Sequence, residues 1–161
     1  MIQTTGVTLN RTSASIQKDS TLLLIPTVEP SNATNKEVTW KSSNTAVATV
    51  DENGKVTAVA GGTCTITCTT KNSSKKATCT VTVIENVTGV TLKPERVTLY
   101  KSQVYTLTPT VLPATATNKT LTWKSSDTSV VRVSAAGVLT AVDEGYATVT
   151  VKTNDGGFEA Y

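Results

Sequence analysis

The chain has 161 residues and a net charge of +3, from 15 basic and 12 acidic side chains, and it contains no histidine. The basic residues form no stripe, so nucleic acid is not expected as a partner, and no apolar run approaches the roughly 18 residues of a membrane span. Without histidine no Ser-His-Asp or Cys-His arrangement can form, and we expect neither an enzyme nor a cofactor.

An internal repeat organises the sequence. The segment Val38–Ser43 returns as Leu121–Ser126, and these two segments hold the only two tryptophans, Trp40 and Trp123. A shift of 83 residues aligns positions 1–78 with positions 84–161, and 32 of the 78 pairs are identical. We therefore expect two domains, residues 1–84 and 85–161.

The residue types favour β-structure. Threonine is the commonest residue, 34 of 161, and β-branched side chains prefer strands. No window shows sustained apolar spacing of three to four, so almost no helix is expected. The fold class is therefore all-β, with two sandwiches of about seven strands each. In the first copy we expect strands at 6–9, 14–17 (an edge segment), 21–28, 47–50, 55–59, 63–70 and 77–83, and a further strand that contains Val38 and Trp40.

Trp40 and Trp123 are expected in the two cores, because tryptophan is the largest apolar body in a chain poor in aromatics. Asn53-Gly54 lies between two of the expected strands. That dipeptide is a strong hairpin signal because the turn requires positive φ.

An outward apolar pair distinguishes the first copy. Alternation along the strand 21–28 places Leu23 and Ile25 on the outer face, where the second copy has Thr106 and Thr108. Leu23 and Ile25 are either scattered surface aliphatics or part of a contact surface.

Three cysteines, Cys64, Cys68 and Cys79, all fall in the first copy, and the first two align with Ala147 and Val151. This favours small apolar core residues. If the loop 71–76 were a symmetric hairpin, Cys68 and Cys79 would face each other, and a disulfide could form after oxidation. We expect reduced thiols and no metal site. Two carboxylate pairs belong either to polar turns or to a calcium site: Asp51-Glu52 and Asp143-Glu144.

Aromatic residues concentrate in the second copy. Four of them align with polar residues of the first copy and form a candidate binding face for glycans or proteins: Tyr100, Tyr146, Phe158 and Tyr161. The alternative is that some of them cover the core locally.

The second copy also lacks a counterpart of Cys79–Val83, so most of its closing strand is expected to be missing. The strand at 146–152 would then have an open edge. A neighbouring subunit or particle protein could complete that edge by strand addition, or the second copy could be frayed. In a longer chain, the missing strand could follow Tyr161.

The repeat resembles the bacterial immunoglobulin-like domains of group 2, which occur in invasin- and intimin-type adhesins and in many phage structural proteins. The resemblance implies two tandem Ig-like β-sandwich domains, the second incomplete, and carries no catalytic motif. The residues that carry it are Gly6–Leu9, Pro26, Pro30, Asn32–Lys36, Thr39-Trp40, Ser42-Ser43, Val47–Asp51, Gly54, Val56–Val59 and Gly62, with Trp123, Val130, Gly137 and Gly145 in the second copy.

Proteins of this kind serve as spacers, adhesion modules or virion decorations. No secretory h-region follows Met1 in this sequence, so either a signal was removed or the protein never had one. If it never had one, free thiols suit assembly inside a cell. The sequence therefore favours a structural or adhesion module on a phage particle surface, in capsid or tail, with attachment to host or glycan surfaces as a further role. The alternative is a cell-surface adhesin or envelope spacer of a bacterium.

Overall fold

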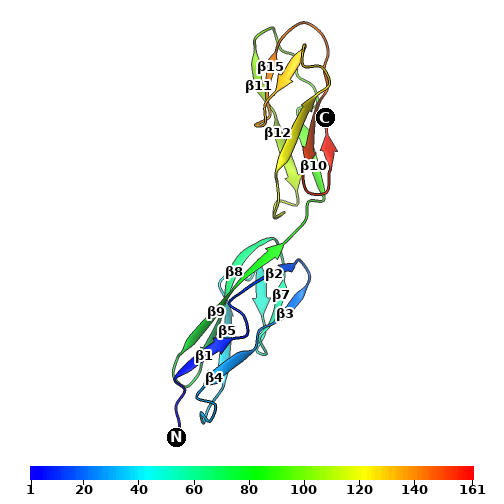
Figure 1. Ribbon diagram of the computed structural model, residues 1–161. Coiled ribbons are helices and arrows are strands. Elements are labelled where there is room, and N and C mark those ends of the chain that lie inside the picture. The colour runs from blue at the N-terminus through cyan, green and yellow to red at the C-terminus, as the bar shows by residue number, and fades with distance from the viewer. The chain divides into compact units, whose positions relative to one another are not determined.

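The computed structural model describes all residues, 1–161, and consists of strands and turns without a helix, so it offers no helix that could cross a membrane. It divides into unit one, Met1–Glu85, and unit two, Asn86–Tyr161 (Figure 1). The division lies one residue beyond the boundary expected from the repeat. The all-β fold class is confirmed.

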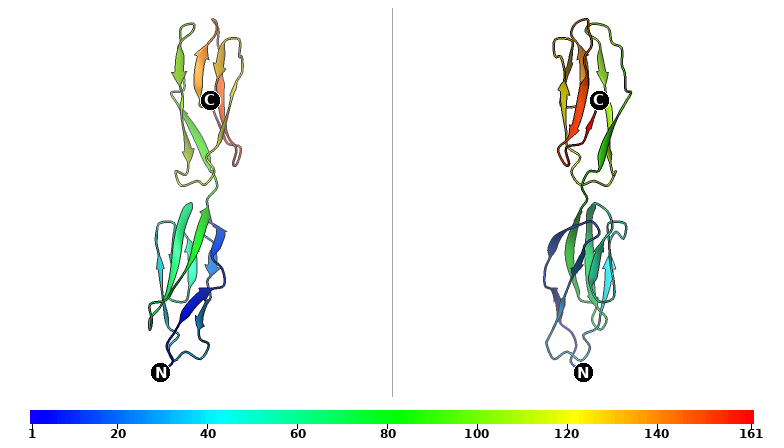
Figure 2. Two further views of the ribbon diagram at one scale, coloured as in Figure 1. Left: turned by 60° about the vertical axis from the view of Figure 1, so that its left-hand side comes forward. Right: turned by 90° about the vertical axis from the view of Figure 1, so that its right-hand side faces the viewer.

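Unit one is a sandwich of two layers. One layer is a four-stranded sheet in the order β2-β9-β8-β5, and the other contains the three-stranded sheet β3-β7-β6 and the pair β1-β4 (Figure 2). The strands are β1 Gly6–Leu9, β2 Ser13–Gln17, β3 Thr21–Leu23, β4 Pro26–Glu29, β5 Val38–Ser42, β6 Ala48–Val50, β7 Lys55–Ala58, β8 Gly62–Thr70 and β9 Lys76–Ile84.

The single strand expected at 21–28 is instead two strands in different sheets. β3 pairs with β7, whereas β4 pairs with β1. We call the point where the chain passes from β3 to β4, at Leu24, the crossing. There the Asn10 side chain accepts the Ile25 N–H (3.0 Å) and donates to the Leu23 carbonyl (3.4 Å). Hydrogen bonds to Asn10 thus satisfy the backbone groups of Leu23 and Ile25 where neither strand can. Side chains therefore still alternate between buried and exposed through the break: Leu24 is fully buried, and its two neighbours are exposed. β2 lies at a sheet edge, as expected, and pairs in parallel with β9.

Unit two repeats this plan with fewer paired strands. Its sheets are β13-β16-β17, β11-β15-β14 and β10-β12. The residues aligned with β2 form no strand, and β17 has two residues where β9 has nine. Within residues 86–161, β17 is thus the whole of the strand that corresponds to β9, and no strand corresponds to β2. The strands are β10 Gly89–Lys93, β11 Val104–Thr106, β12 Thr108–Leu112, β13 Leu121–Ser125, β14 Val131–Val133, β15 Val138–Ala141, β16 Val149–Thr153 and β17 Glu159–Ala160.

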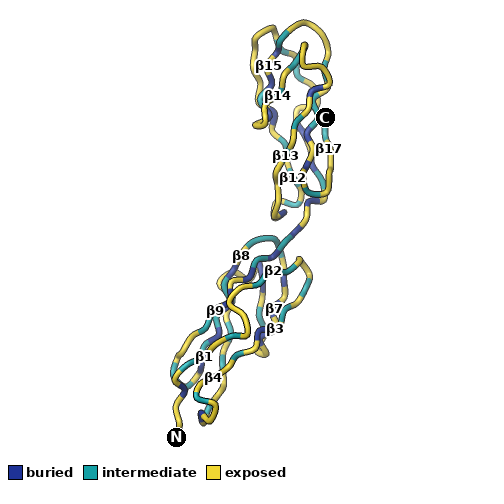
Figure 3. Tube along the Cα trace, in the orientation of Figure 1, coloured by how far each residue is buried: buried dark blue, intermediate teal, exposed yellow.

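The two cores differ in how well they are sealed (Figure 3). In unit one, the core contains fully buried residues from both layers, among them Leu24, Val56, Ile66 and Val81. In unit two, Val151 is the one member of the core cluster at zero exposure. Burial of apolar surface drives folding, so unit two has the weaker core.

A tryptophan on one layer packs against a glycine on the other in both units. Gly54, at φ 81°, lies in the β6–β7 turn, and a β-carbon built on it would lie 2.6 Å from the Trp40 ring. The Gly54 carbonyl also accepts the Leu24 N–H (2.9 Å). Gly137 makes both contacts in unit two. A β-carbon built on it would lie 2.6 Å from the Trp123 ring, and its carbonyl accepts the Leu107 N–H (3.0 Å).

The turn conformation corrects one detail of the sequence reading. Gly54 has positive φ, but Asn53 does not, so this is not the hairpin turn in which both central residues need that conformation. The Asp51 carboxylate holds the turn by accepting the N–H groups of Asn53 (2.9 Å) and Lys55 (2.8 Å). For this reason alanine is tolerated at the Asn53 position in unit two.

We predict that Gly54→Ala destabilises unit one by about 2–4 kcal/mol, from a left-handed alanine and a clash with Trp40. The measurement is urea unfolding followed by circular dichroism. Gly6→Ala is the matched control, since a β-carbon there meets nothing within 4 Å. Equal stability of the two variants would contradict the contact.

Candidate interaction surfaces

The apolar pair on unit one is exposed, as the sequence predicts. Leu23 and Ile25 are 52% and 53% exposed. They lie on either side of the crossing between β3 and β4, where Asn10 holds their backbone groups. The pair therefore sits on an ordered segment with its side chains available for contact.

Tyr100 and Tyr146 come from two loops at the same end of unit two. Ser102 donates its N–H to the Ala141 carbonyl (2.9 Å), and the Lys101 ammonium lies 3.1 Å from the Asp143 carboxylate. The Lys101 ammonium hydrogen bond, with a smaller contribution from the Glu144 N–H, lowers the pKa of Asp143. Tyr100 is 78% exposed and Tyr146 is fully exposed.

Phe158 and Tyr161 do not join that pair. β16 separates them from it, because the strand begins three residues after Tyr146 and ends in the hairpin that carries Phe158. Phe158 is 38% exposed, and its ring lies against Gly156 in that hairpin. Phe158 thus lies over the turn of its own hairpin, whereas Tyr161 is exposed beside β17. The four aromatics do not form one face.

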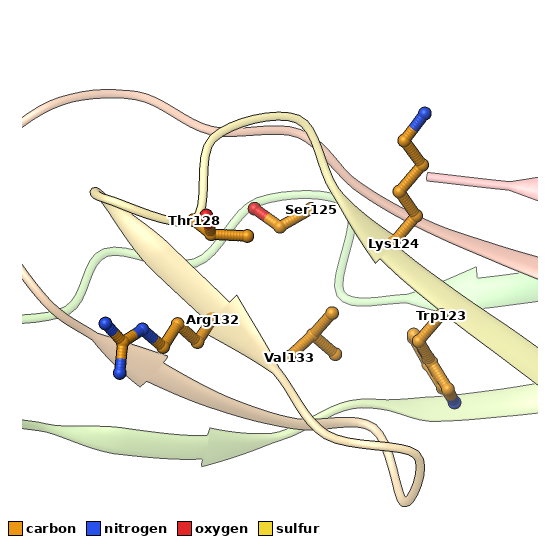
Figure 4. A pocket seen from close by; sticks show the side chains of 6 residues that line it. All are labelled: Trp123, Lys124, Ser125, Thr128, Arg132 and Val133. Atoms are coloured by element: carbon orange, nitrogen blue, oxygen red, sulfur yellow. The ribbon is translucent and has the colours of Figure 1, made fainter.

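A surface depression at Trp123 was not anticipated from the sequence. Its lining comes from β13, β14 and the connection between them, with Val133 at its centre and the Lys124 side chain extending away (Figure 4). A depression in unit one also includes the tryptophan, Trp40, but it extends over the β6–β7 turn toward Lys71 instead. Each tryptophan is half-buried and packed on a core cluster, so the expected core role is combined with an exposed edge. The lining residues in unit two are Trp123, Lys124, Ser125, Thr128, Arg132 and Val133.

The predicted opposition of Cys68 and Cys79 is wrong. In the β8–β9 ladder, Cys68 lies opposite Ala77 and Cys79 opposite Ile66. Thr70 and Lys75 already pair, through a 2.9 Å bond from the Lys75 N–H to the Thr70 hydroxyl, so the loop is shorter than assumed and the register shifts by two residues. All three thiols are free and buried, which supports the core-filling interpretation.

Burial also suppresses thiol chemistry. Desolvation raises the pKa of Cys68 to about 11 and raises that of Cys79, whereas the charge of Arg11 acts in the opposite direction on Cys79. The thiolate is the reactive form, so neither thiol is poised as a nucleophile.

We predict that native protein reacts slowly with a thiol reagent at pH 8 and that three thiols titrate rapidly after unfolding in urea. The reason is the low thiolate fraction and the burial of the sulfur atoms. Ellman titration with and without urea measures this. A single thiol after unfolding would mean that a disulfide had formed.

A buried carboxylate holds the end of unit one. Glu85 is 6% exposed, accepts the Gly61 N–H (2.9 Å) and pairs with the Lys18 ammonium at 2.5 Å. The hydrogen bond to Glu85, together with its charge, raises the pKa of Lys18. A raised lysine pKa means that the stabilisation is complete below the ordinary value of 10.5 and is lost as the pH rises through the folded-state value.

We predict that Glu85→Gln lowers the stability of unit one at pH 7 more than Glu37→Gln does. Glu37 belongs to an exposed pair with Lys71 at 3.4 Å, and exposed pairs contribute little. Urea unfolding of both variants, and of each combined with Lys18→Met, measures the coupling. If Glu85→Gln and Lys18→Met were strictly additive, Glu85 and Lys18 would not interact.

The carboxylate pairs considered for calcium serve local structure. Asp51 holds its turn, and Asp143 pairs with Lys101. No three potential metal-binding side chains gather anywhere in residues 1–161.

Two layers of mostly antiparallel strands packed around a buried core define each unit as an immunoglobulin-like sandwich. The chain belongs to the family of bacterial Ig-like domains (group 2), whose model matches residues 3–81 and 86–161. The resemblance and the tandem Ig-like fold expected from the sequence are thereby confirmed.

Three relatives illustrate where similar chains occur. An uncharacterized protein of Clostridium acetobutylicum is 39% identical over 153 residues, which cover 94% of this chain and 16% of that protein. An alpha-L-arabinofuranosidase of Bifidobacterium longum subsp. longum is 37% identical over 158 residues, which cover 96% of this chain and 14% of that protein. An Ig-like virion protein of Serratia phage KSP90 is 39% identical over 132 residues, which cover 79% of this chain and 51% of that protein. The chain thus spans about half of these relatives' length, or much less.

Proposed function

We propose that the chain is a non-catalytic structural or adhesion module displayed on the surface of a phage particle. The observation that carries the proposal is the similarity to a virion protein that is itself Ig-like, of which this chain covers 51%. The other two relatives share only 16% and 14% of their length with the chain. As a display module, the chain contributes folded β-domains whose outer residues contact other subunits or a host surface.

The location can be tested on particles. Mass spectrometry of gradient-purified phage should detect the protein, and immunogold labelling of intact particles should place it on the outside. The matched sample is the envelope fraction of uninfected bacteria. Protein found in that fraction and missing from particles would reject the proposal.

The exposed pair of unit one supports a role in assembly. Leu23 and Ile25 are aliphatic on a face where unit two has Thr106 and Thr108. We predict that Leu23→Thr with Ile25→Thr leaves the melting temperature within about 2 °C, since surface substitutions change stability little, and weakens incorporation into particles. Thr106→Ser with Thr108→Ser is the control. Unchanged incorporation of the Leu23/Ile25 double variant would remove this pair from the contact surface.

The tyrosine pair of unit two supports a role in attachment. Tyr100 and Tyr146 present aromatic rings with polar tips, which suit stacking on sugars and contacts with protein. We predict that Tyr100→Ala with Tyr146→Ala reduces binding to host cells or glycan arrays and spares stability. Tyr161→Ala is the control for loss of an exposed ring. Equal loss of binding and of thermal stability would show that the rings cover the core instead.

A second function is an appended module of a bacterial surface or secreted protein, as an adhesin part or envelope spacer. The observation that favours it is the match to a protein named as a glycosidase, of which the chain covers 14%. A chain with this role would cofractionate with the cell envelope or culture medium, so the fractionation above separates the two functions.

A further inference from the structure

β13 is an edge strand, and one of its two sides has no strand beside it. It pairs with β16 alone, and β5 lies at the corresponding edge in unit one, so the open edge belongs to the fold of both units. The Thr148 carbonyl accepts the Ser126 N–H (2.8 Å). At the other end of the strand, the Thr120 carbonyl accepts the Asn154 N–H (3.0 Å), so the even-numbered residues face β16. Because an antiparallel ladder alternates, three residues direct their N–H and C=O groups to the open side: Leu121, Trp123 and Ser125.

The depression at Trp123 lies along this edge. Trp123 lines it from β13, and Val133, from the edge strand of the other layer, lies at its centre (Figure 4). The edge of β14 is less open, because the Val131 N–H already donates to the Asp127 carbonyl (3.0 Å). Side chains of a strand alternate between its two faces. Every second side chain of a strand added to β13 would therefore point toward the half-buried Trp123 and Val133.

Two cations flank the depression and have no acidic partner. Lys124 lies on β13 and Arg132 on β14, on either side of Val133 (Figure 4). Both are exposed, and neither takes part in the four ion pairs of residues 1–161. A charge on a strand favours an opposite charge directly across from it, and Arg132 adds positive potential nearby. The edge is therefore suited to an acidic partner.

Unit one has the corresponding edge but a more acidic depression. Asp51 and Glu52 line that depression. The aligned residues of unit two are the uncharged Ser134 and Ala135. A threonine stands in unit one where unit two has Arg132. Each of these exchanges makes unit two more positive, so an acidic partner should distinguish unit two from unit one.

We propose that unit two binds an extended acidic segment of another protein along the open edge of β13. The segment alternates apolar and acidic residues. Its main chain pairs with Leu121, Trp123 and Ser125, its apolar side chains cover the depression, and its acidic side chains lie on the outer face beside Lys124. This is recognition by strand addition, with main-chain bonds for affinity and alternate side chains for specificity. The inference goes beyond the proposed function, since it does not depend on where the protein is displayed.

The same charges disfavour a second copy of this chain as the occupant. Pairing of β13 with β13 would bring Lys124 of both chains to one face of a continuous sheet. Like charges on neighbouring strands are destabilising, and lysine on an edge strand opposes self-pairing. The occupant is therefore a different chain that carries the opposite charge.

The test uses the full chain and a soluble peptide that alternates glutamate and valine over about seven residues, an ordinary strand length. We expect saturable binding, with hydrogen exchange at the Trp123 and Ser125 amides slowed at least about tenfold. The Thr122 and Lys124 amides are internal controls, because they already face β16, and the Trp40 amide of unit one should also stay unchanged. Unchanged exchange at Trp123 and Ser125 would overturn the proposal, and equal slowing at Trp40 would overturn selection by charge.

Two matched peptides test the pattern. Lysine in place of every glutamate keeps the apolar positions and reverses the charge, so binding should be lost. Serine in place of every valine keeps the charge and removes the side chains that cover the depression, so binding should weaken at least about tenfold. A lysine peptide that binds as well as the glutamate peptide would reject charge complementarity.

Variants of the protein locate the site. Lys124→Ser with Arg132→Thr should weaken binding of the glutamate peptide at least about tenfold and leave the melting temperature within about 2 °C. Lys93→Ser with Arg96→Thr is the matched control, since it removes the same charge from exposed residues outside the depression. Equal binding by the two double variants would contradict the assigned site.

An acidic polysaccharide is the competing class of occupant, because two cations beside an aromatic ring also suit an anionic sugar. Polygalacturonate serves as the probe. Polygalacturonate binding that is lost in the Lys124/Arg132 variant, together with no binding of the glutamate peptide, would overturn the proposal in favour of a glycan. Peptide binding that slows exchange at Trp123 and Ser125, without polygalacturonate binding, would support it.

Discussion

Each unit depends on one contact between a tryptophan and a glycine. In unit one, the Trp40 ring from β5 lies against Gly54 in the turn of the opposite layer, and the Gly54 carbonyl holds Leu24 at the crossing between β3 and β4. A large aromatic body fills the gap between layers only if the facing residue has no side chain. One small region thus links both layers and fixes the point where the chain passes from β3 to β4.

Unit two shows that the same contact tolerates changes around it. The same contact is present there: the Trp123 ring lies against Gly137 in the turn, and the Gly137 carbonyl accepts the N–H of Leu107 at the crossing. Ser134 takes the place of Asp51 and still accepts the turn N–H groups, from Ala136 (3.3 Å) and Val138 (3.1 Å). What the fold requires is therefore an acceptor at the start of the turn and a glycine at its end, and the residues between them can vary.

The repeat made most of the fold predictable, because comparing two copies separates inward from outward positions. The crossing between β3 and β4 was not predictable, since Leu24 remains inward and Leu23 outward whether or not the strand changes sheets. The cysteine register failed for a different reason. Thr70 and Lys75 pair through a side-chain bond inside the presumed loop, and strand alternation carries no information about where a hairpin loop begins.

The sequence predicted which single residues are exposed better than it predicted which of them lie together on the surface. Exposure of Leu23, Tyr100 and Tyr146 followed from comparing the copies. Grouping Phe158 with the tyrosines did not hold, because Tyr146 precedes β16 and Phe158 follows it, so they lie at opposite ends of that strand. The depression at Trp123 carried no sequence signal beyond the tryptophan itself, since it depends on β13 and β14 both being edge strands.

The two units therefore divide stability and surface differently. Unit one covers its core with β9, a central strand that has β2 on one side and β8 on the other. On its outer face it differs from unit two by one exposed aliphatic pair, Leu23 and Ile25. Unit two retains the tryptophan contact but leaves Val97, Leu99 and Val149 half-buried along a sheet with few paired strands. Apolar residues that are not fully buried and backbone groups without a ladder partner lower the free energy of unfolding. The tryptophan–glycine contact is therefore what the two units share, and how completely the core around it is buried is what differs between them.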